Sequence, residues 1–279
     1  MNKALDLLIR VLPGSLRPYV RGRMTGGGIP PAPETFGLTS VDAIEERDVV
    51  IVGWPKSGNT WLQNCAAGLL YGLQPEWTPD AVIQTLVPDM HWFPAYRRFQ
   101  SPMFFKSHSL PRPEYRRVVY LVRDGRDALV SFYHHQSAVT GTVPEWRDLI
   151  AHGAGEFGTW AQHVRAWQEN PYDAEILTIR YEDMKQDLPR ELSRLCAFAG
   201  LAREAAMIRA AAENASFAKM KLQDQRFGQS GAGWPAGIPF VRRGQVGSYQ
   251  DEMPPEALQA FLEQSRSALS QFGDASDGN

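Results

Sequence analysis

The feature that most constrains the fold is a strand–loop–helix pattern near residue 50. Asp48 is followed at residues 49–52 by Val-Val-Ile-Val, an unbroken run of β-branched residues. Such a run is typical of a strand that is buried on both faces of a parallel sheet. Residues 53–60 then read Gly-Trp-Pro-Lys-Ser-Gly-Asn-Thr, and a helical pattern runs from residue 61 to about residue 73. Strand, glycine-containing loop and helix in this order predict the start of a βαβ unit.

Further strand and helix patterns alternate along the rest of the chain. The expected strands cover residues 103–108, 117–123 and 175–181, and the expected helices cover residues 126–136, 156–169, 186–199 and 202–213. Strands that alternate with helices predict a parallel sheet covered on both sides. We therefore expect a single-domain α/β fold, with a central parallel β-sheet flanked by helices and a P-loop-like loop at residues 53–60.

The expected domain spans residues 48–270, preceded by an N-terminal helix and a Gly/Pro-rich arm at 1–47 and followed by a flexible tail at 271–279. Residues 5–24 combine four arginines with aliphatic residues. Packing of this segment on the domain is favoured over contact with an anionic membrane surface. Residues 223–241 are rich in glycine and proline, so they predict either a mobile lid or a static surface loop.

Composition excludes several classes of protein. The 279 residues are 43% hydrophobic and 22% charged, which excludes a disordered chain, and the net charge of −2 argues against a nucleic-acid partner. No stretch approaches the roughly 20 apolar residues of a membrane-spanning helix. Two cysteines are too few for a disulfide framework, so a cytoplasmic location is expected.

The loop at residues 53–60 differs from the loop that binds nucleoside triphosphates. That motif, G-x-x-x-x-G-K-[ST], matches at Gly53, Gly58 and Thr60, but Asn59 stands where it requires lysine. Lys56 lies in the middle of the loop instead. Because the usual lysine reaches the β- and γ-phosphates, a displaced lysine indicates a different anion. Taken alone, the pattern is equally typical of a tight turn with a solvated lysine.

Six segments in the same order give this chain a specific resemblance. They are PKSGNTW at 55–61, FFKSH at 104–108, LVRDGRDALVSFYHH at 121–135, RYEDM at 180–184, ASFAKM at 215–220 and FVRRGQVG at 240–247. Together they resemble the cytosolic-type sulfotransferases, which use 3′-phosphoadenosine 5′-phosphosulfate (PAPS). The resemblance implies a phosphosulfate-binding loop and transfer of a sulfuryl group to a hydroxyl or amine by in-line attack.

The resemblance implies three catalytic residues. It assigns the general base to His108, and a histidine has a pKa near the operating pH, as that role requires. His108 follows Lys106 by two residues on an expected strand, so the two side chains project from one face. Lys56 is expected to stabilise the leaving phosphate, and Lys106 to share this role by neutralising sulfuryl oxygens.

The resemblance also implies the nucleotide-binding residues, with adenosine 3′,5′-bisphosphate as the product. The 5′-phosphate is expected at the backbone N–H groups of Ser57, Gly58, Asn59 and Thr60. The 3′-phosphate is expected at Arg123, Ser131, Arg242 and Arg243, because arginine donates to phosphate in pairs. Adenine and ribose are expected beside Trp61, Tyr181 and Phe217, with Ser216 and Gly244 in the adjoining segments. Core packing is the alternative role of the aromatic residues.

The chain departs from the family pattern at several positions. Asn59 and Ala215 replace usual threonines, and Arg243 replaces a usual lysine. Ser248-Tyr249 replaces a usual Asp-Trp pair, and the sequence after it lacks the dimerisation motif of the animal enzymes. Both a monomer and a homodimer therefore remain open.

The acceptor is expected to be a small or lipid-like molecule. Residues 74–102 contain Trp77, His91, Trp92, Phe93, Tyr96 and Phe99, which form either an acceptor pocket or an aromatic mini-core. No metal-ligand spacing is present. Two alternatives to a sulfotransferase remain: a small-molecule kinase with a related loop, and a catalytically silent nucleotide-binding module.

Overall fold

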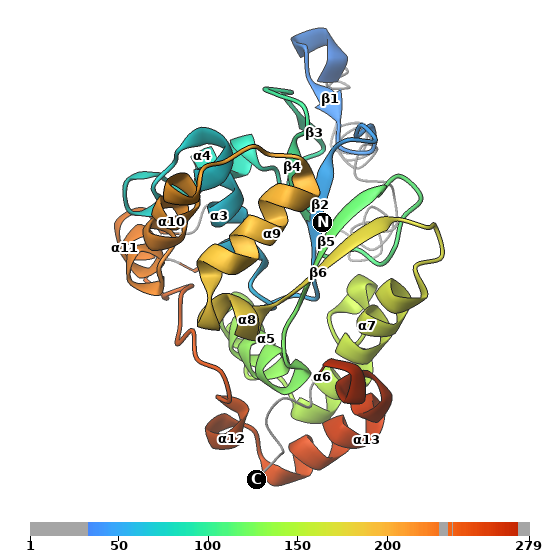
Figure 1. Ribbon diagram of the computed structural model, residues 1–279. Coiled ribbons are helices and arrows are strands. Elements are labelled where there is room, and N and C mark those ends of the chain that lie inside the picture. The colour runs from blue at the N-terminus through green and yellow to red at the C-terminus, as the bar shows by residue number, and fades with distance from the viewer. Residues whose placement is uncertain (1–32, 229–233, 236, 273–279) are drawn as a thin grey trace, which may run out of the picture.

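The computed structural model describes residues 33–228, 234–235 and 237–272 (Figure 1). The strands are β1 (Thr39–Ser40), β2 (Val49–Val52), β3 (Ala95–Tyr96), β4 (Phe104–Ser107), β5 (Arg117–Val122) and β6 (Glu175–Arg180). The helices are α3 (Asn59–Tyr71), α4 (Asp80–Leu86), α5 (Gly125–Thr140), α6 (Trp146–His152), α7 (Trp160–Glu169), α8 (Tyr181–Gln186), α9 (Leu188–Ala199), α10 (Ala205–Asn214), α11 (Phe217–Phe227), α12 (Tyr249–Glu252) and α13 (Pro255–Phe272). Single 3₁₀ turns are η1 (Pro33–Phe36), η2 (Pro75–Trp77) and η3 (Gly155–Phe157).

The central sheet has four strands in the order β4-β2-β5-β6, and every neighbouring pair is parallel. The predicted parallel sheet is therefore confirmed, and each predicted strand agrees with the observed one to within one residue at either end. A separate antiparallel pair joins β1 to β3. The residue after each central strand (Gly53, His108, Arg123 and Tyr181) belongs to a segment that the sequence singled out. The carboxyl edge of the sheet is where ligands bind in open parallel sheets.

Helices cover both faces of this sheet (Figure 1). On one face, Val49 and Ile51 of β2 pack in a core with residues of α3, α9 and α10. On the other face, Val50 and Val52 pack in a second core with residues of α5, α6, α7 and α13. Successive strand residues point to opposite faces, so a strand covered on both sides must be apolar throughout, as the run at 49–52 is.

Two expectations about the ends of the domain fall partly outside the described residues. The N-terminal helix within residues 1–32, part of the 223–241 segment and residues 273–279 are not described. Within 223–241, α11 continues as far as Phe227, so the loop is shorter than expected. Helix α13 ends at Phe272, two residues after the expected end of the domain. None of the helices in the described part of the chain is both long and apolar enough to cross a bilayer.

Gly125, the first residue of α5, lies against aromatic rings of two neighbouring helices. A Cβ atom on Gly125 would lie 2.5 Å from the Trp160 ring on α7 and 2.7 Å from the Phe261 ring on α13. Both rings are buried, at 2% exposure. Neither ring can move far in a packed core, so glycine allows these three helices to approach one another.

We expect Gly125→Ala to lower the free energy of unfolding by about 1–3 kcal/mol, the usual cost of overpacking. Urea unfolding followed by circular dichroism measures the change. Gly68→Ala in α3 is the matched control, because its Cβ would come no closer than 3.3 Å to another group, the Leu73 carbonyl oxygen. Equal stability of the two variants would contradict this account.

Candidate active site

The loop between β2 and α3 has a backbone that demands glycine at two positions. Gly58 caps α3 in the left-handed region, with φ of +104°, where side chains are disfavoured. At Gly53 a Cβ would lie 2.4 Å from the Leu121 carbonyl oxygen on β5. The loop therefore packs directly against β5, and its last residues direct the free N–H groups at the start of α3 outward. The Ser57 N–H differs, because it already donates to the Trp54 carbonyl oxygen at 3.1 Å.

A cavity of about 490 Å³ lies over this loop and receives most of the predicted site residues. Those that line it are Lys56, Gly58, Asn59, Thr60, Trp61, Lys106, His108, Arg123, Tyr181, Phe217, Arg242 and Gly244. Ser57, Ser131, Ser216 and Arg243 are not among its lining residues. Segments up to 190 residues apart in sequence thus contribute to one cavity.

Lys56 places its ammonium group against aromatic faces in this cavity. The Nζ atom lies 3.9 Å from the centre of the Phe240 ring and 6.0 Å from that of Trp234. Burial, followed by the charges of nearby cations, lowers the pKa of Lys56 to about 7. These cations are Lys106, Arg123 and Arg242. A cluster of positive groups whose members disfavour one another's charge is stabilised by an anion, so the cavity is suited to a phosphate-bearing ligand.

His108 has one nitrogen committed and one free. Its Nδ1 atom lies 2.7 Å from the Gly53 carbonyl oxygen. A carbonyl can only accept, so Nδ1 carries the hydrogen and Nε2 carries the lone pair. Burial, followed by the charge of Lys106, lowers the pKa of His108 to about 3. The imidazole is therefore neutral near pH 7, and Nε2 is the atom that can accept a proton.

Asn59, which replaces a threonine of the family pattern, holds the loop beside the histidine strand. Its Nδ2 donates to the Gly53 carbonyl oxygen at 3.1 Å and to the Ser107 carbonyl oxygen at 3.3 Å. The side chain thus bridges the ends of β2 and β4, where a nucleoside-triphosphate loop would have a lysine that reaches its ligand.

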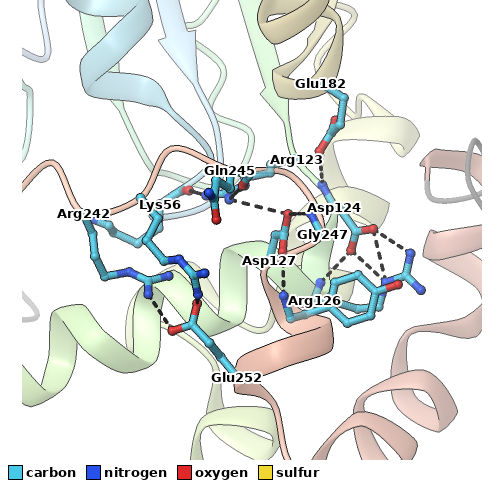
Figure 2. Close-up of polar contacts among 12 residues, drawn as sticks. Lys56, Arg123, Asp124, Arg126, Asp127, Glu182, Arg242, Gln245, Gly247 and Glu252 are labelled. Carbon is cyan, nitrogen blue, oxygen red and sulfur yellow. Dashed lines mark hydrogen bonds and ion pairs between the residues drawn. The ribbon is translucent and has the colours of Figure 1, made fainter. Parts of the chain in front are cut away.

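Arg123 is fixed between the loop at residues 53–60 and the C-terminal segment at residues 240–247 (Figure 2). Its guanidinium donates to the Lys56 carbonyl oxygen at 3.3 Å and to the Gln245 carbonyl oxygen at 2.9 Å. It also lies 4.4 Å from the centre of the Tyr181 ring. Asp127 of α5 accepts from the Gly247 N–H at 2.8 Å and so ties this C-terminal segment to the helix. Arg123 is therefore presented to the cavity in one orientation.

Glu252 of α12 pairs with Arg242 (Figure 2), and the same carboxylate also pairs with Arg243. Glu252 Oε2 lies 2.5 Å from Arg242 Nη1, and Oε1 lies 2.8 Å from Arg243 Nη1. His134 Nε2 lies 2.7 Å from the same Oε2. Burial opposes the charge of Glu252, but hydrogen bonds from the two arginines hold the pKa of its carboxyl below the usual value. An internal anion therefore occupies the arginine pair that the sequence assigned to the 3′-phosphate.

The remaining predicted nucleotide residues lie on the α3, α8 and α11 side. Trp61 packs edge-on to Tyr181, with ring centres 5.6 Å apart, and its Nε1 donates to the Ala215 carbonyl oxygen at 2.7 Å. This bond fixes the indole beside the ASFAKM segment. Phe217 begins α11 directly after Ser216 and lines the cavity with Trp61.

The aromatic residues expected to form an acceptor pocket divide into two groups. His91 and Trp92 line the cavity. The other four are not among the lining residues: Trp77 stacks on Arg226, Tyr96 is buried against Phe105, and Phe93 and Phe99 are partly exposed. The apolar wall also includes four residues that were not predicted to line it, namely Phe132, Val139, Phe157 and Trp234. Helical and loop positions of this type carry no sequence signal until the fold brings them together.

Two polar residues of the cavity were missed as functional candidates. Asp89 was not singled out, and His91 was considered only as part of the aromatic segment. Asp89 Oδ2 lies 2.8 Å from Lys106 Nζ, and the His91 ring lies 5.7 Å from the His108 ring. The spacing Asp-x-His at 89–91, which parallels Lys-x-His at 106–108, was the available signal. Within the described residues, no group of three or more His, Cys, Asp or Glu side chains could hold a metal ion.

Known proteins resemble this chain over most of its length. Mouse sulfotransferase 1E1 is 24% identical over 245 residues, which cover 77% of this chain and 81% of the relative. Bovine sulfotransferase 1E1 is 28% identical over 244 residues, which cover 76% and 80%.

Two solved structures share the fold. Mouse sulfotransferase SULT7A1 complexed with PAP has a TM-score of 0.59 at 23% identity, covering 81% of this chain and 84% of that chain. Retinol dehydratase in complex with retinol and PAP has a TM-score of 0.65 at 19% identity, covering 100% and 97%.

A family model described as the sulfotransferase domain matches residues 46–273. The match covers most of the chain and includes all six segments on which the resemblance rested, so the family prediction is confirmed. The chain belongs to the sulfotransferase domain family.

Proposed function

We propose that this protein transfers a sulfuryl group from PAPS to a hydroxyl group of a small, largely apolar acceptor. The observation that carries the proposal is the shared cavity: Lys56, from the loop after β2, and His108, which follows the neighbouring strand β4, both line it, and His108 Nδ1 is bound to the Gly53 carbonyl oxygen. Family membership and the PAP complexes of the two structural neighbours support a donor of this type.

Donor binding uses the positive end of α3 and the cationic residues around it. The 5′-phosphate is bound by the N–H groups of residues 58–60, and the 3′-phosphate by Arg123 together with Arg242 and Arg243. Trp61 and Phe217 enclose the adenine. A guanidinium donates to phosphate through two parallel N–H groups, which fixes both position and orientation.

Attack requires removal of the proton from the acceptor hydroxyl. His108 takes this proton at Nε2, while Nδ1 keeps its hydrogen bond to the Gly53 carbonyl. The same bond stabilises the imidazolium that forms. Burial, followed by the charge of Lys106, holds the pKa of His108 low in the free protein, and the negative charges of a bound donor raise it toward the range in which a base is effective.

The leaving group is the phosphate of adenosine 3′,5′-bisphosphate. Negative charge accumulates on its bridging oxygen as the bond to sulfur breaks. Lys56 supplies the positive charge there, and Lys106 offsets charge on the sulfuryl oxygens. Donors aimed at charge that develops in the transition state are worth about 3–4 kcal/mol each.

The acceptor side of the cavity is apolar and uncharged apart from paired groups. Its walls include Trp92, Phe132, Val139 and Phe157, and the acidic residue Asp89 is already paired with Lys106. This lining favours a neutral acceptor with an apolar body. Retinol dehydratase, one of the structural neighbours, has been solved in complexes with retinol and with androsterone.

A kinase activity is less well supported. The phosphate-contacting lysine of a kinase loop is replaced by Asn59, whose amide is engaged with the Gly53 and Ser107 carbonyl oxygens. An assay with labelled PAPS and a panel of phenols, steroids and aliphatic alcohols tests the proposal. Preference for ATP over adenosine 3′,5′-bisphosphate in magnesium-free titrations would overturn it.

We expect His108→Ala to lower kcat by a factor of about 10²–10⁴, the usual contribution of a general base. Affinity for adenosine 3′,5′-bisphosphate should change less than about threefold, because the residue acts on the acceptor proton. Sulfate transfer and calorimetric titration measure the two quantities. A parallel loss of nucleotide affinity would assign His108 to binding instead.

We expect Arg242→Ala combined with Arg243→Ala to weaken the binding of adenosine 3′,5′-bisphosphate by at least about tenfold, since each charged hydrogen bond contributes about 1.5–3 kcal/mol. Adenosine 5′-monophosphate, which lacks the 3′-phosphate, should lose less than about threefold. Glu252→Gln is the matched control. It removes the carboxylate that competes for the arginines, so it should raise the affinity for the bisphosphate and leave the affinity for the monophosphate unchanged. Equal losses for the two nucleotides would refute the assignment.

We expect nucleotide binding at pH 8 to take up a proton at Lys56. With a pKa of about 7 in the free protein, Lys56 is largely neutral at pH 8, and bound phosphates raise its pKa. Uptake should vanish below about pH 6, where Lys56 is already charged. Calorimetry in buffers of different ionisation enthalpy counts the protons. Lys56→Arg keeps the charge but does not titrate, so uptake that persists in this variant would contradict the prediction.

A further inference from the structure

Residues 88–91 lie alongside β4 in a way that pairs two short motifs. The Lys106 N–H donates to the Pro88 carbonyl oxygen at 2.8 Å, and the Met90 N–H donates to the Lys106 carbonyl oxygen at 2.9 Å. These two bonds make a parallel bridge that sets Asp89 opposite Lys106. The chain turns directly after this bridge, and the side chains of Asp89 and His91 contact Lys106 and the His108 backbone respectively.

The first pair is an ion pair in a nearly dry position. Asp89 Oδ2 lies 2.8 Å from Lys106 Nζ, and the two side chains are 1% and 8% exposed. The other oxygen, Oδ1, accepts the His91 N–H at 3.0 Å. Burial alone would raise the pKa of Asp89, but Lys106 reverses this and holds it below the usual value. The carboxylate therefore stays charged and fixes the direction of the Lys106 ammonium.

The second pair joins the two histidines. His91 Nε2 accepts the backbone N–H of His108 at 2.8 Å, which requires a lone pair on Nε2. The rings stack at 17° with centres 5.7 Å apart. Phe157 packs against both histidines, with its ring centre 4.7 Å from that of His91 and 5.7 Å from that of His108. Burial lowers the pKa of His91 and so keeps this imidazole neutral.

We propose that Asp89 and His91 are positioning residues, which hold the Lys106 ammonium and the His108 backbone in the geometry that sulfuryl transfer requires. The proposal rests on the proposed function of His108 and Lys106. Neither residue exchanges a proton with the acceptor: Asp89 acts through Lys106, and His91 acts through the His108 backbone. Displacement of a reacting group by about 1 Å can cost about 100-fold in rate, so loss of either contact should appear in kcat.

Three substitutions test the histidine contact. His91→Phe keeps an aromatic ring for stacking but has no acceptor, and we expect kcat to fall by at least about tenfold with nucleotide affinity within about threefold of wild type. His91→Gln carries an acceptor oxygen at a similar reach and should recover kcat to within about threefold. His91→Leu replaces His91→Phe if that variant does not fold.

Asp89→Asn tests the ion pair, because the amide keeps the shape and removes the charge. We expect kcat to fall by about tenfold with little change in nucleotide affinity. Asp48→Asn is the matched control: Asp48 is also buried and paired with an arginine, Arg98, but lies at the start of β2 and is not a lining residue of the cavity. It should lower stability and leave kcat per folded molecule unchanged.

Several outcomes would overturn the proposal. Equal kcat for wild type, His91→Phe and Asp89→Asn would do so, as would equal losses for His91→Phe and His91→Gln. A rise in acceptor KM without a change in kcat would show that His91 lines the acceptor pocket and does not position the His108 backbone. The amide proton shift of His108, measured by NMR, follows the His91 contact without any assay. This chemical shift should change in His91→Phe and remain as in wild type in His91→Gln. The contact between His91 and the His108 backbone therefore remains testable even if no acceptor is sulfated and the proposed function fails.

Discussion

The parallel hydrogen bonding of β2 between β4 and β5 is the constraint from which the candidate site is built. Val52 is opposite Ser107 on one side and Tyr120 on the other, so these three strands end within a few residues of one another. The segments that follow these three strands begin at Gly53, His108 and Arg123. Residues that are some 70 positions apart in sequence therefore share one edge, and this arrangement needs no side-chain contact to establish it.

Carboxylates partner several of the cations that line the cavity. Lys106 is matched by Asp89, Arg123 lies 3.6 Å from Asp127, and Arg242 shares Glu252 with its neighbour. The ammonium of Lys56 lies beside the rings of Phe240 and Trp234, and burial, followed by the nearby cations, lowers its pKa to about 7. A bound phosphate would favour the charged form of this ammonium, which is consistent with its proposed contact with the leaving group.

The sequence was informative wherever function depends on local order. The β-branched run at 49–52, the displaced Lys56 and the Lys-x-His spacing each predicted a feature that depends on a few adjacent residues. It was uninformative where function depends on packing between distant segments. Phe132, Phe157 and Trp234 reach the cavity from α5, η3 and the C-terminal segment, and no periodicity marks them. Glu252 likewise lies outside every motif and becomes relevant only because α12 folds back onto the two arginines.

The hydrogen bond between His108 and the Gly53 carbonyl has a consequence for how this site can change over time. A main-chain oxygen is present whatever amino acid occupies the position, so no single codon change can delete the partner that selects the imidazole tautomer. Steric crowding against Leu121 instead restricts that position to the smallest residue. The tautomer of His108 is therefore insulated from drift in side-chain chemistry, whereas its pKa still depends on burial and on the charge of Lys106.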